Sequence, residues 1–322
     1  MRLDRPAGFW AFFWNYFVGL SLGLNFPSAK PPPSILEVAL LVLYLLVWAA
    51  IFRGIVCTWN DILDQDFDRK VARTRFRPIA RGAISTAQAY IFTLGQVAVG
   101  AMLLTPFPRG AHAHALVEGA LLFIYPLLKR VTDFPQVVLA FAISEGLFFS
   151  CAILGREPLM PLLNEIGIIG DANIDKVVRM PLASSHFYAM ALVYLALVLW
   201  TVIFDTVYAH QDYTDDKKAG VHGLAVLLGR KGTKPAFLVL ALLQVACLVA
   251  AGKSAGFGWT YFTLSCIGTG GCLMFMIGNV RLEEGSSCAW WFGPGSRLVG
   301  TAISSGLLAE FIANRHPLAF ML

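Results

Sequence analysis

The chain has 322 residues and a formal net charge of +5, and it is 57% hydrophobic but only 14% charged. A water-soluble domain has about 45–50% apolar and about 25% charged residues, so this balance excludes an ordinary soluble protein. The positive charge does not indicate nucleic-acid binding, because no basic run is interleaved with exposed aromatic residues. No nucleic-acid partner is therefore expected, and the bilayer is the expected environment.

Nine apolar segments are each long enough to cross a membrane. A spanning helix needs about 17–25 residues, and helices are expected because a lipid-exposed backbone must satisfy its own hydrogen bonds. The sequence predicts an all-α, polytopic membrane protein with a single domain over residues 1–322. In chain order, the nine predicted transmembrane helices are 8–26, 35–57, 86–106, 113–128, 135–155, 186–207, 234–251, 258–280 and 298–315.

Lys and Arg gather in alternate loops between these segments. With the N-terminus on the cytosolic side, the polar loops 58–85 and 208–234 and the basic pair at 129–130 also lie on that side. An excess of Lys and Arg in cytosolic loops supports this orientation. The long polar stretch 155–185 would lie on the opposite side.

The first polar loop crowds acids and bases into the sequence NDILDQDFDRKVARTRFRPIARG, residues 60–82. Asn60, Asp64 and Asp68 are spaced i, i+4 and i+8, which places them on one face of a helix, and Asp61 flanks that face. Carboxylates one turn apart repel one another, and the repulsion grows beside a low-dielectric environment. The pattern predicts a bound cation, although the acids and bases of a solvated loop could also pair among themselves.

The second polar loop repeats the pattern in DTVYAHQDYTDD, residues 205–216. Asp212 and Asp216 are again one turn apart, Tyr208 lies a turn earlier, and Asp205 precedes it. Oxygen ligands without His or Cys favour Mg²⁺, which prefers one or two carboxylates plus substrate phosphates. Two facing motifs therefore predict two ions holding one diphosphate. The cations that would hold the remaining phosphate oxygens are Arg69, Lys70, Arg73, Arg77 and Arg81.

These residues resemble the motifs of the UbiA-superfamily membrane prenyltransferases. The segment N-D-x-x-D-x-x-x-D at 60–68 resembles the first aspartate motif, and residues 199–229 resemble the second. YPLLKRVTDFPQ at 125–136 is similar to the segment between helices 4 and 5, and RLDRPAGFW at 2–10 resembles the opening of the branch that acts on 4-hydroxybenzoate. The resemblance covers about residues 2–230. It implies a nine-helix bundle with a central cavity, and Mg²⁺-dependent transfer of a prenyl group from a prenyl diphosphate to a commonly aromatic acceptor.

The resemblance also implies roles for individual positions. The metal ligands would be Asn60, Asp64, Asp68, Asp212 and Asp216. The catalytic residues would be Asp64, Asp68, Asp212, Asp216 and Tyr208, and Phe67 is a second aromatic candidate for stabilising an allylic cation. His210 and His222 are candidate bases, although histidines satisfied by loop contacts are the simpler interpretation. The diphosphate-binding residues would be Arg69, Lys70, Arg73, Arg77, Lys129 and Arg130.

Three departures from the family pattern bear on the acceptor. Gln65 stands where many members carry a basic residue, His222, Gly223 and Leu224 replace the more usual Lys-Ser-Thr, and the 155–185 loop is longer than expected. The changed segment, together with an N-terminus that lacks an Arg- and Ser-rich leader, favours a relative of the fungal enzymes that prenylate aromatic polyketides. By that analogy we expect farnesyl diphosphate as the donor and an endomembrane location of the ER or Golgi type.

Three other functions are also compatible with the sequence. The first is a 4-hydroxybenzoate polyprenyltransferase of ubiquinone biosynthesis, in the mitochondrial inner membrane or a bacterial plasma membrane. The second is a UbiA-type terpene cyclase, which would ionise the same donor and close the cation internally. The third is a membrane transporter, which is disfavoured because transporters place ionisable residues mid-span, whereas here they gather in loops. No obligate protein partner is expected.

Overall fold

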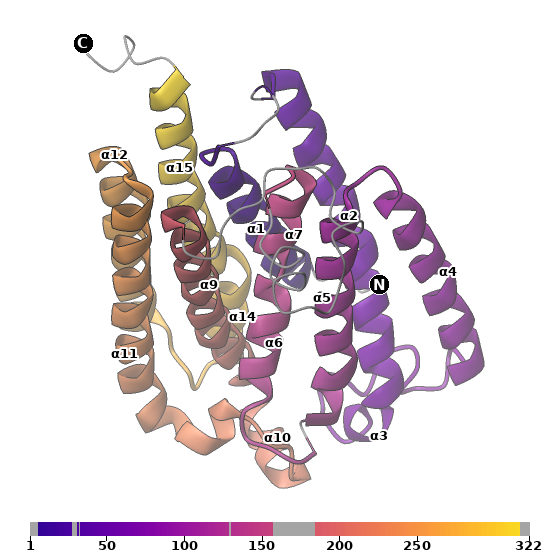
Figure 1. The fold of residues 1–322 in the computed structure, drawn as a ribbon. Helices are drawn as coiled ribbons and strands as arrows, with labels where there is room; N and C mark the ends of the chain where they lie inside the picture. Colours follow the sequence, from indigo (N-terminus) through magenta and orange to yellow (C-terminus); the bar gives the residue numbers. More distant parts are fainter. Residues whose placement is uncertain (1–5, 28–30, 32, 129, 157–183, 316–322) are drawn as a thin grey trace.

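The computed structural model describes residues 6–27, 31, 33–128, 130–156 and 184–315. Within these residues the chain is all-helical and contains no strand. Lys129 and most of the predicted 155–185 loop lie outside the described residues. Figure 1 shows the helices packed side by side. They are α1 (Ala7–Gly23), α2 (Ile35–Leu63), α3 (Gln65–Asp68), α4 (Thr86–Leu104), α5 (Arg109–Leu128), α6 (Pro135–Ser144), α7 (Gly146–Ile153), α9 (Ser185–Ala209), α10 (Tyr213–Ala219), α11 (Leu224–Ala255), α12 (Trp259–Tyr261), the π-helical η2 (Phe262–Ile267), α13 (Gly268–Asn279), α14 (Gly285–Trp290), the π-helical η3 (Trp291–Gly295) and α15 (Ser296–Arg315).

Seven helical segments of the described chain are long and apolar enough to cross a membrane. They are α2, α4, α5, the α6–α7 pair, α9, α11 and the segment from α12 to α13. The other two predicted spans correspond to α1, which has 17 residues, and α15, which carries Arg297 and Glu310. Both pack along the bundle, α1 against α7 and α15. The all-α membrane fold is confirmed, and the count of nine spans stays a prediction.

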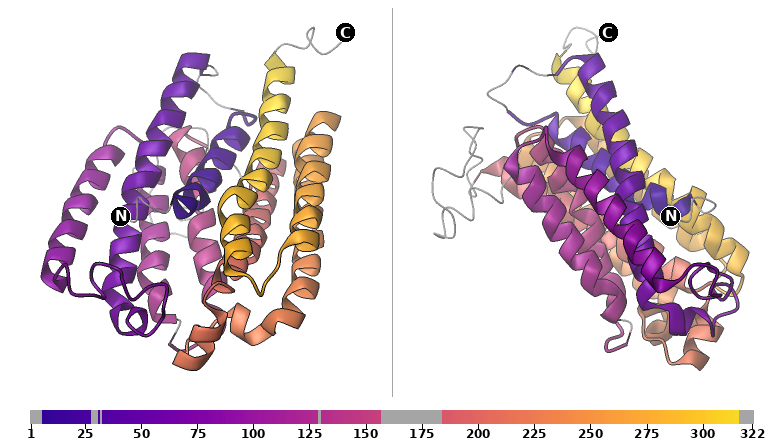
Figure 2. Two further views of the ribbon diagram at one scale, coloured as in Figure 1. Left: turned by 180° about the vertical axis from the view of Figure 1, so that it is seen from behind. Right: turned by 90° about the vertical axis from the view of Figure 1, so that its right-hand side faces the viewer.

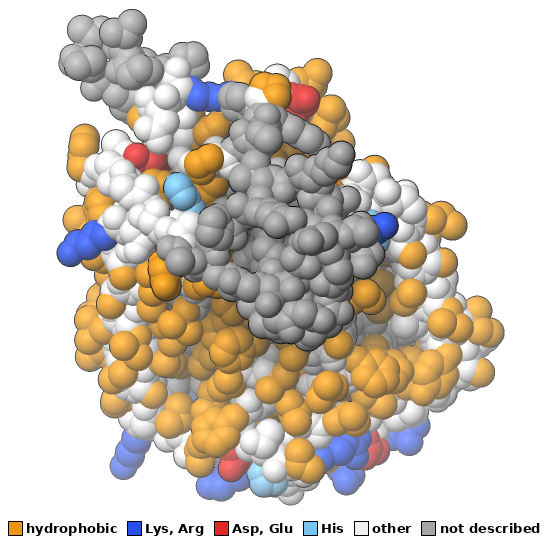
Figure 3. Space-filling view, viewed as in Figure 1, with side chains coloured by type: hydrophobic (Ala, Val, Ile, Leu, Met, Phe, Trp, Pro, Cys, Tyr) orange, Lys and Arg blue, Asp and Glu red, His pale blue; other side chains and the backbone are white. Residues whose placement is uncertain are grey.

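The outer faces of the spanning helices are apolar. On α4, Ile91, Leu94 and Met102 have exposed fractions of 70%, 67% and 69%. Figure 3 shows hydrophobic side chains over the middle of the molecule and charged side chains at its lower edge. Water would not stabilise so large an apolar surface, whereas lipid would. The chain is therefore an integral, multi-pass membrane protein.

Glycines bring α1 into close contact with the α6–α7 pair. A Cβ added to Gly19 would lie 2.4 Å from the carbonyl oxygen of Leu147, and one on Gly146 would lie 2.7 Å from the ring of Tyr16. Small residues let membrane helices approach closely enough for their backbones to pack. This contact fixes α1 beside α7 along one side of the bundle.

The two polar loops lie at the same end of the bundle. In Figure 1, α3 and α10 both lie at the lower end, and the two views in Figure 2 agree. The first loop ends where Ser85 caps α4: its hydroxyl accepts a bond from the Gln88 N–H at 3.2 Å, and its own N–H donates to the Gln88 side chain at 2.9 Å. The shared position of α3 and α10 confirms, for the described residues, the predicted placement of both acidic motifs at one face of the bundle.

Candidate active site

Each acidic motif consists of a long helix, a break at one aspartate and a short helix. Asp64 breaks the first (φ −91°, ψ 6°) and Asp212 breaks the second (φ −108°, ψ 6°). The carbonyl of Asp64 accepts a bond from the N–H of Asp68, and that of Asp212 from Asp216, both at 2.8 Å. The predicted helix is therefore interrupted at Asp64, although Asn60 and Asp64 keep the predicted shared face, with Asn60 Nδ2 donating to Asp64 Oδ2 at 2.9 Å.

These breaks bring both motifs to one cavity. Its volume is about 850 Å³, and it reaches from the polar end of the bundle between α2, α6 and α9. All the predicted metal-binding and catalytic residues lie on its wall, although the two motifs are far apart in the sequence. The acidic, amide and phenolic side chains that line it are Asn60, Asp61, Asp64, Asp68, Tyr125, Gln136, Asp205, Tyr208, Gln211, Asp212 and Asp216.

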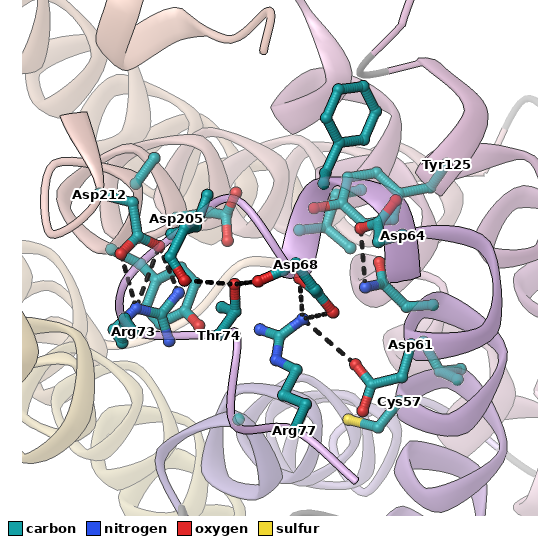
Figure 4. A pocket seen from close by; sticks show the side chains of 18 of the residues that line it. Cys57, Asp61, Asp64, Asp68, Arg73, Thr74, Arg77, Tyr125, Asp205 and Asp212 are labelled. Atoms are coloured by element: carbon teal, nitrogen blue, oxygen red, sulfur yellow. Dashed lines mark hydrogen bonds and ion pairs between the residues drawn. The ribbon is translucent and has the colours of Figure 1, made fainter. Parts of the chain in front are cut away.

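Two arginines of the first loop bind the acids across this cavity. Arg77 Nη1 lies 2.7 Å from both oxygens of Asp68 and 3.2 Å from Asp61 Oδ1. Arg73 forms a bidentate ion pair with Asp212, with Nε 2.8 Å from Oδ1. Figure 4 shows both arginines between the acidic side chains. Arg73 therefore links the first polar loop directly to the second motif.

The other described cations that were predicted to bind the diphosphate lie elsewhere. Arg69 donates to the carbonyl of Ala80 at 2.9 Å, so it holds the loop together. Arg130 forms an ion pair with Asp66 at 2.9 Å and donates to the carbonyl of Leu63 at 2.8 Å. The side chains of Arg69, Lys70 and Arg130 do not line the cavity. Lys129 falls outside the described residues.

Both aromatic candidates line the cavity with cations against their rings. The Arg73 guanidinium lies 5.0 Å from the centre of the Tyr208 ring, and Tyr208 also packs against Phe292 at 4.5 Å. Arg130 lies 4.6 Å from the ring centre of Phe67. A ring face that attracts a guanidinium can also attract the positive charge of an allylic cation.

The donor set of this cavity fits Mg²⁺. The candidate ligands are oxygens of carboxylates and one amide, which a hard divalent ion prefers. No three His, Cys, Asp or Glu side chains converge on one point in the part of the chain that the structure describes. Burial raises the pKa of Asp68 despite the opposing effect of Arg77, so a bound cation would relieve a desolvation cost there.

The structure adds residues that the motifs did not indicate. Arg53, which is 5% exposed, lies on α2 about two turns before Asn60 and lines the cavity. A Cβ added to Gly8 would lie 3.0 Å from Arg53 Nε, so α1 leaves room for this guanidinium. Gln136 lines the cavity on α6. In the sequence, Arg53 is a lone cation within an apolar span. That position is the signal by which its role in the cavity could have been predicted.

Comparison with known proteins identifies the family. The model of the UbiA prenyltransferase family matches residues 12–300. The chain belongs to the UbiA prenyltransferase family. It is 33% identical over 295 residues to "Prenyltransferase stbC" of Stachybotrys bisbyi, with 91% of this chain and 81% of that protein covered. It is also 33% identical to "4-hydroxybenzoate geranyltransferase 1" of Lithospermum erythrorhizon, with 95% and 87% covered. The chain is thus an enzyme, a membrane prenyltransferase, and not a transporter.

Solved structures share the fold of this UbiA-family enzyme. An apo UbiA homolog from Aeropyrum pernix K1 matches with a TM-score of 0.66 at 20% identity, covering 98% of this chain and 99% of that chain. A homolog from Archaeoglobus fulgidus bound to GPP and Mg²⁺ matches with a TM-score of 0.64 at 19% identity, covering 96% and 98%. The bundle with its cavity is therefore the UbiA fold.

The segment that departs from the family pattern borders the cavity of this UbiA-family chain. His222 Nδ1 lies 2.8 Å from Asp133 Oδ1, and the N–H of Leu224 donates to Gln136 Oε1 at 3.1 Å. His222 and Gly223 both line the cavity. The loop after α10 is thus bound to the loop before α6, and His222 engages a carboxylate there. Gln65, the other described departure, donates to the carbonyl of Ile62 at 3.0 Å and does not line the cavity.

His210 anchors the second motif to α11. Its Nε2 lies 2.9 Å from Thr233 Oγ1, and Thr233 Oγ1 lies 2.7 Å from the carbonyl of Gly229. The hydroxyl has one proton, which it donates to Gly229, so it accepts a bond from the ring N–H of His210. Burial, with a smaller contribution from Arg230, lowers the pKa of His210 to about 4, which keeps the imidazole neutral near pH 7. Gly229 (φ 62°) breaks α11 at this point.

Replacement of Thr233 by valine is expected to lower the free energy of unfolding by about 1–3 kcal/mol, because it leaves the buried ring N–H of His210 without its acceptor. Thr93→Val is the matched control, since Thr93 also donates to the carbonyl four residues earlier, at 2.9 Å. Unfolding in detergent micelles measures both variants. An equal loss in the two would show that the bond from His210 contributes nothing.

Proposed function

We propose that this enzyme transfers a farnesyl group from farnesyl diphosphate to a phenolic acceptor in specialised, meroterpenoid biosynthesis, with Mg²⁺ as cofactor. The observation that carries the proposal is the cavity in which both acidic motifs, Arg73 and Arg77 meet beneath apolar helices. Carboxylates suit divalent cations, and cations suit a diphosphate. An endomembrane location fits this role.

The polar end of the cavity would bind and release the diphosphate. Mg²⁺ bound by the motif acids would supply positive charge to the leaving diphosphate. Arg73 and Arg77 now hold Asp212 and Asp68, and the diphosphate competes with these carboxylates for the two guanidinium groups. Donors placed in advance at a developing charge stabilise the transition state without reorganisation. The bond between the prenyl C1 and the diphosphate oxygen then breaks.

The rest of the cavity would hold the prenyl chain and the acceptor. Phe12, Leu139 and Ile143 give it an apolar wall suited to an isoprenoid chain. The ring of Tyr208 would face the positive charge that develops at C1. A ring carbon of the phenol attacks C1, a carbon–carbon bond forms, and the ring then loses its proton. The enclosing helices exclude water, which would otherwise capture the cation.

The relatives support an aromatic acceptor, with 4-hydroxybenzoate as the second candidate. The printed names include "DMOA farnesyltransferase nvfB" of Aspergillus novofumigatus, 33% identical over 277 residues, with 86% of this chain and 78% of that protein covered. Names with 4-hydroxybenzoate occur at similar identity. The buried guanidinium of Arg53 in the cavity favours an acceptor that carries a carboxylate, which either class can supply.

Membranes that contain the full chain test the proposal. Radiolabelled farnesyl diphosphate, Mg²⁺ and a panel of phenolic acids are supplied, with and without EDTA. The expected result is a labelled aromatic adduct that forms only with the metal. A cyclised hydrocarbon made without any acceptor would identify a terpene cyclase. Absence of diphosphate release from geranyl, farnesyl and geranylgeranyl diphosphate alike would overturn the proposal.

Arg53→Met is expected to raise the KM for an acidic acceptor about 10- to 100-fold, because a hydrogen bond to a charged group contributes about 1.5–3 kcal/mol. The KM for the prenyl diphosphate should change little. Arg156→Met is the matched control, since Arg156 is also 5% exposed but does not line the cavity. Steady-state kinetics with a phenolic acid and its methyl ester measure the effect. If KM rises equally for acid and ester, Arg53 does not bind the carboxylate.

A further inference from the structure

A buried polar cluster lies between α1, α5 and the junction of α6 with α7. It consists of Tyr16, His114, Glu118 and Glu145, whose exposed fractions are 0%, 2%, 0% and 6%. Ionisable side chains are costly within a membrane span and commonly have a function there. None of these four residues lines the cavity. The proposed chemistry therefore leaves them without a role.

The members of this buried polar cluster bind one another across helices. The hydroxyl of Tyr16 on α1 lies 2.9 Å from each carboxylate oxygen of Glu118 on α5, and it donates its proton there. His114 Nδ1, also on α5, lies 2.5 Å from Glu145 Oε1. Glu145 is the residue between α6 and α7. The cluster thus ties α1 to α5 and α5 to the α6–α7 junction.

Tyr16 lies directly behind the apolar wall of the cavity. Phe12, one turn before Tyr16 on α1, lines the cavity, and so does Ile143 on α6. Phe12, Ile143 and Tyr16 belong to one packed group of buried side chains. Gly146, the first residue of α7, follows Ile143 by three residues, and an added Cβ there would lie 2.7 Å from the Tyr16 ring. Tyr16 and Gly146 therefore lie about one turn beyond Phe12 and Ile143, the last residues of α1 and α6 that line the cavity.

The Tyr16 ring is held on several sides. Its hydroxyl is fixed by Glu118, one face lies against Gly146, and Phe149 packs edge-on with ring centres 5.5 Å apart. Phe149 in turn stacks on Trp48 at 4.9 Å. Close-packed interiors resist the displacement of a large side chain. A ligand that reached this point would have to stop rather than push the ring aside.

We propose that the ring of Tyr16, packed against Gly146 and Phe149, forms the end wall of the prenyl-binding cavity and limits the length of the prenyl chain that the enzyme accepts. This inference rests on the proposed function, but it does not depend on which donor is preferred. A hydrophobic pocket discriminates against one extra methylene by about 10- to 200-fold. A further isoprene unit is larger than a methylene, so a fixed wall should reject it at least as strongly.

Competition between donors of different length tests the wall. Membranes with the full chain receive equal geranyl, farnesyl and geranylgeranyl diphosphate and one phenolic acceptor. Tyr16→Ala is expected to shift the product ratio toward the next longer donor by about tenfold or more. Tyr16→Phe keeps the ring and should keep the wild-type ratio. Binding of unreactive thiolodiphosphate analogues of the same lengths gives the comparison without turnover.

Tyr261→Ala is the matched control for the lost packing. Tyr261 is also fully buried, donates to the carbonyl of Leu248 at 3.0 Å, and packs on Gly252, where an added Cβ would lie 2.5 Å from its ring. It lies on α12 and does not line the cavity. This variant should lose stability as Tyr16→Ala does, without a change in the product ratio.

The possible outcomes separate the end wall from the proposed function. An unchanged ratio in Tyr16→Ala, or an equal shift in Tyr261→Ala, overturns the inference while the wild type still forms product. If Tyr16→Ala does not accumulate in membranes, Tyr16→Leu takes its place, and an unchanged ratio there overturns the inference in the same way. A wild type that forms no adduct from any donor contradicts the proposed function instead. In that case the binding of the thiolodiphosphate analogues to the wild type and to Tyr16→Ala tests whether Tyr16 limits the chain length.

Discussion

Asp64→Ala and Asp212→Ala should each lower prenyl transfer by at least about 10³-fold, because single groups that stabilise developing charge supply about 10²–10³ and a metal ligand acts on the same charge. Both aspartates line the cavity at the breaks of the two motifs. The milder variants Asp64→Asn and Asp212→Asn should raise the Mg²⁺ concentration needed for half-maximal activity. Product formation and a Mg²⁺ titration measure these effects.

Neighbouring acids provide the matched controls. Asp66 lies two residues from both Asp64 and Asp68, but its side chain is 53% exposed and paired with Arg130. Asp215 accepts a bond from the N–H of Ala72 at 3.2 Å and does not line the cavity. Surface pairs of this kind contribute about 0–1 kcal/mol, so Asp66→Ala and Asp215→Ala should retain activity. Equal loss in all four alanine variants would contradict the assignment of the metal site.

The second large effect is expected for Arg73→Ala and Arg77→Ala. Each should lower kcat/KM for the prenyl diphosphate by about 10²–10³, because each loses a guanidinium that binds the leaving group. Each variant also leaves a carboxylate without its cation, the half-buried Asp212 or the buried Asp68. Mg²⁺ should therefore raise the unfolding temperature of these variants more than that of the wild type. Kinetics and thermal unfolding with and without Mg²⁺ measure the two effects.

Arg75→Ala is the control for the arginine variants. Arg75 lies between Arg73 and Arg77 in the sequence, but its side chain is exposed and its guanidinium lies 4.7 Å from the centre of the Phe76 ring. Its removal changes the net charge of the loop by the same amount. Activity that falls equally in all three variants would indicate a general effect of loop charge rather than contacts with the diphosphate.

Much of the function could be predicted because its signals are local in the sequence. Spans of apolar residues indicate a membrane protein whatever their packing, and the acids at 60–68 and 205–216 carry their spacing with them. The family model confirms the resemblance drawn from those motifs. The helix breaks at Asp64 and Asp212 could not be predicted, because an i, i+4 spacing of polar residues fits both a continuous helix and one that is interrupted at a single residue.

The sequence alone determined the membrane class, the family and the two acidic motifs, because hydropathy and spacing depend only on neighbouring residues. The tertiary structure decided which side of the loop each charge faces. Arg73 reaches Asp212 on another helix, whereas Arg69 turns back to Ala80 and Arg130 binds Asp66 at the surface. The place of Tyr16 behind the cavity likewise depends on α5 and α6 packing beside α1. Such contacts join residues far apart in the chain, and only the packing of the bundle brings them together.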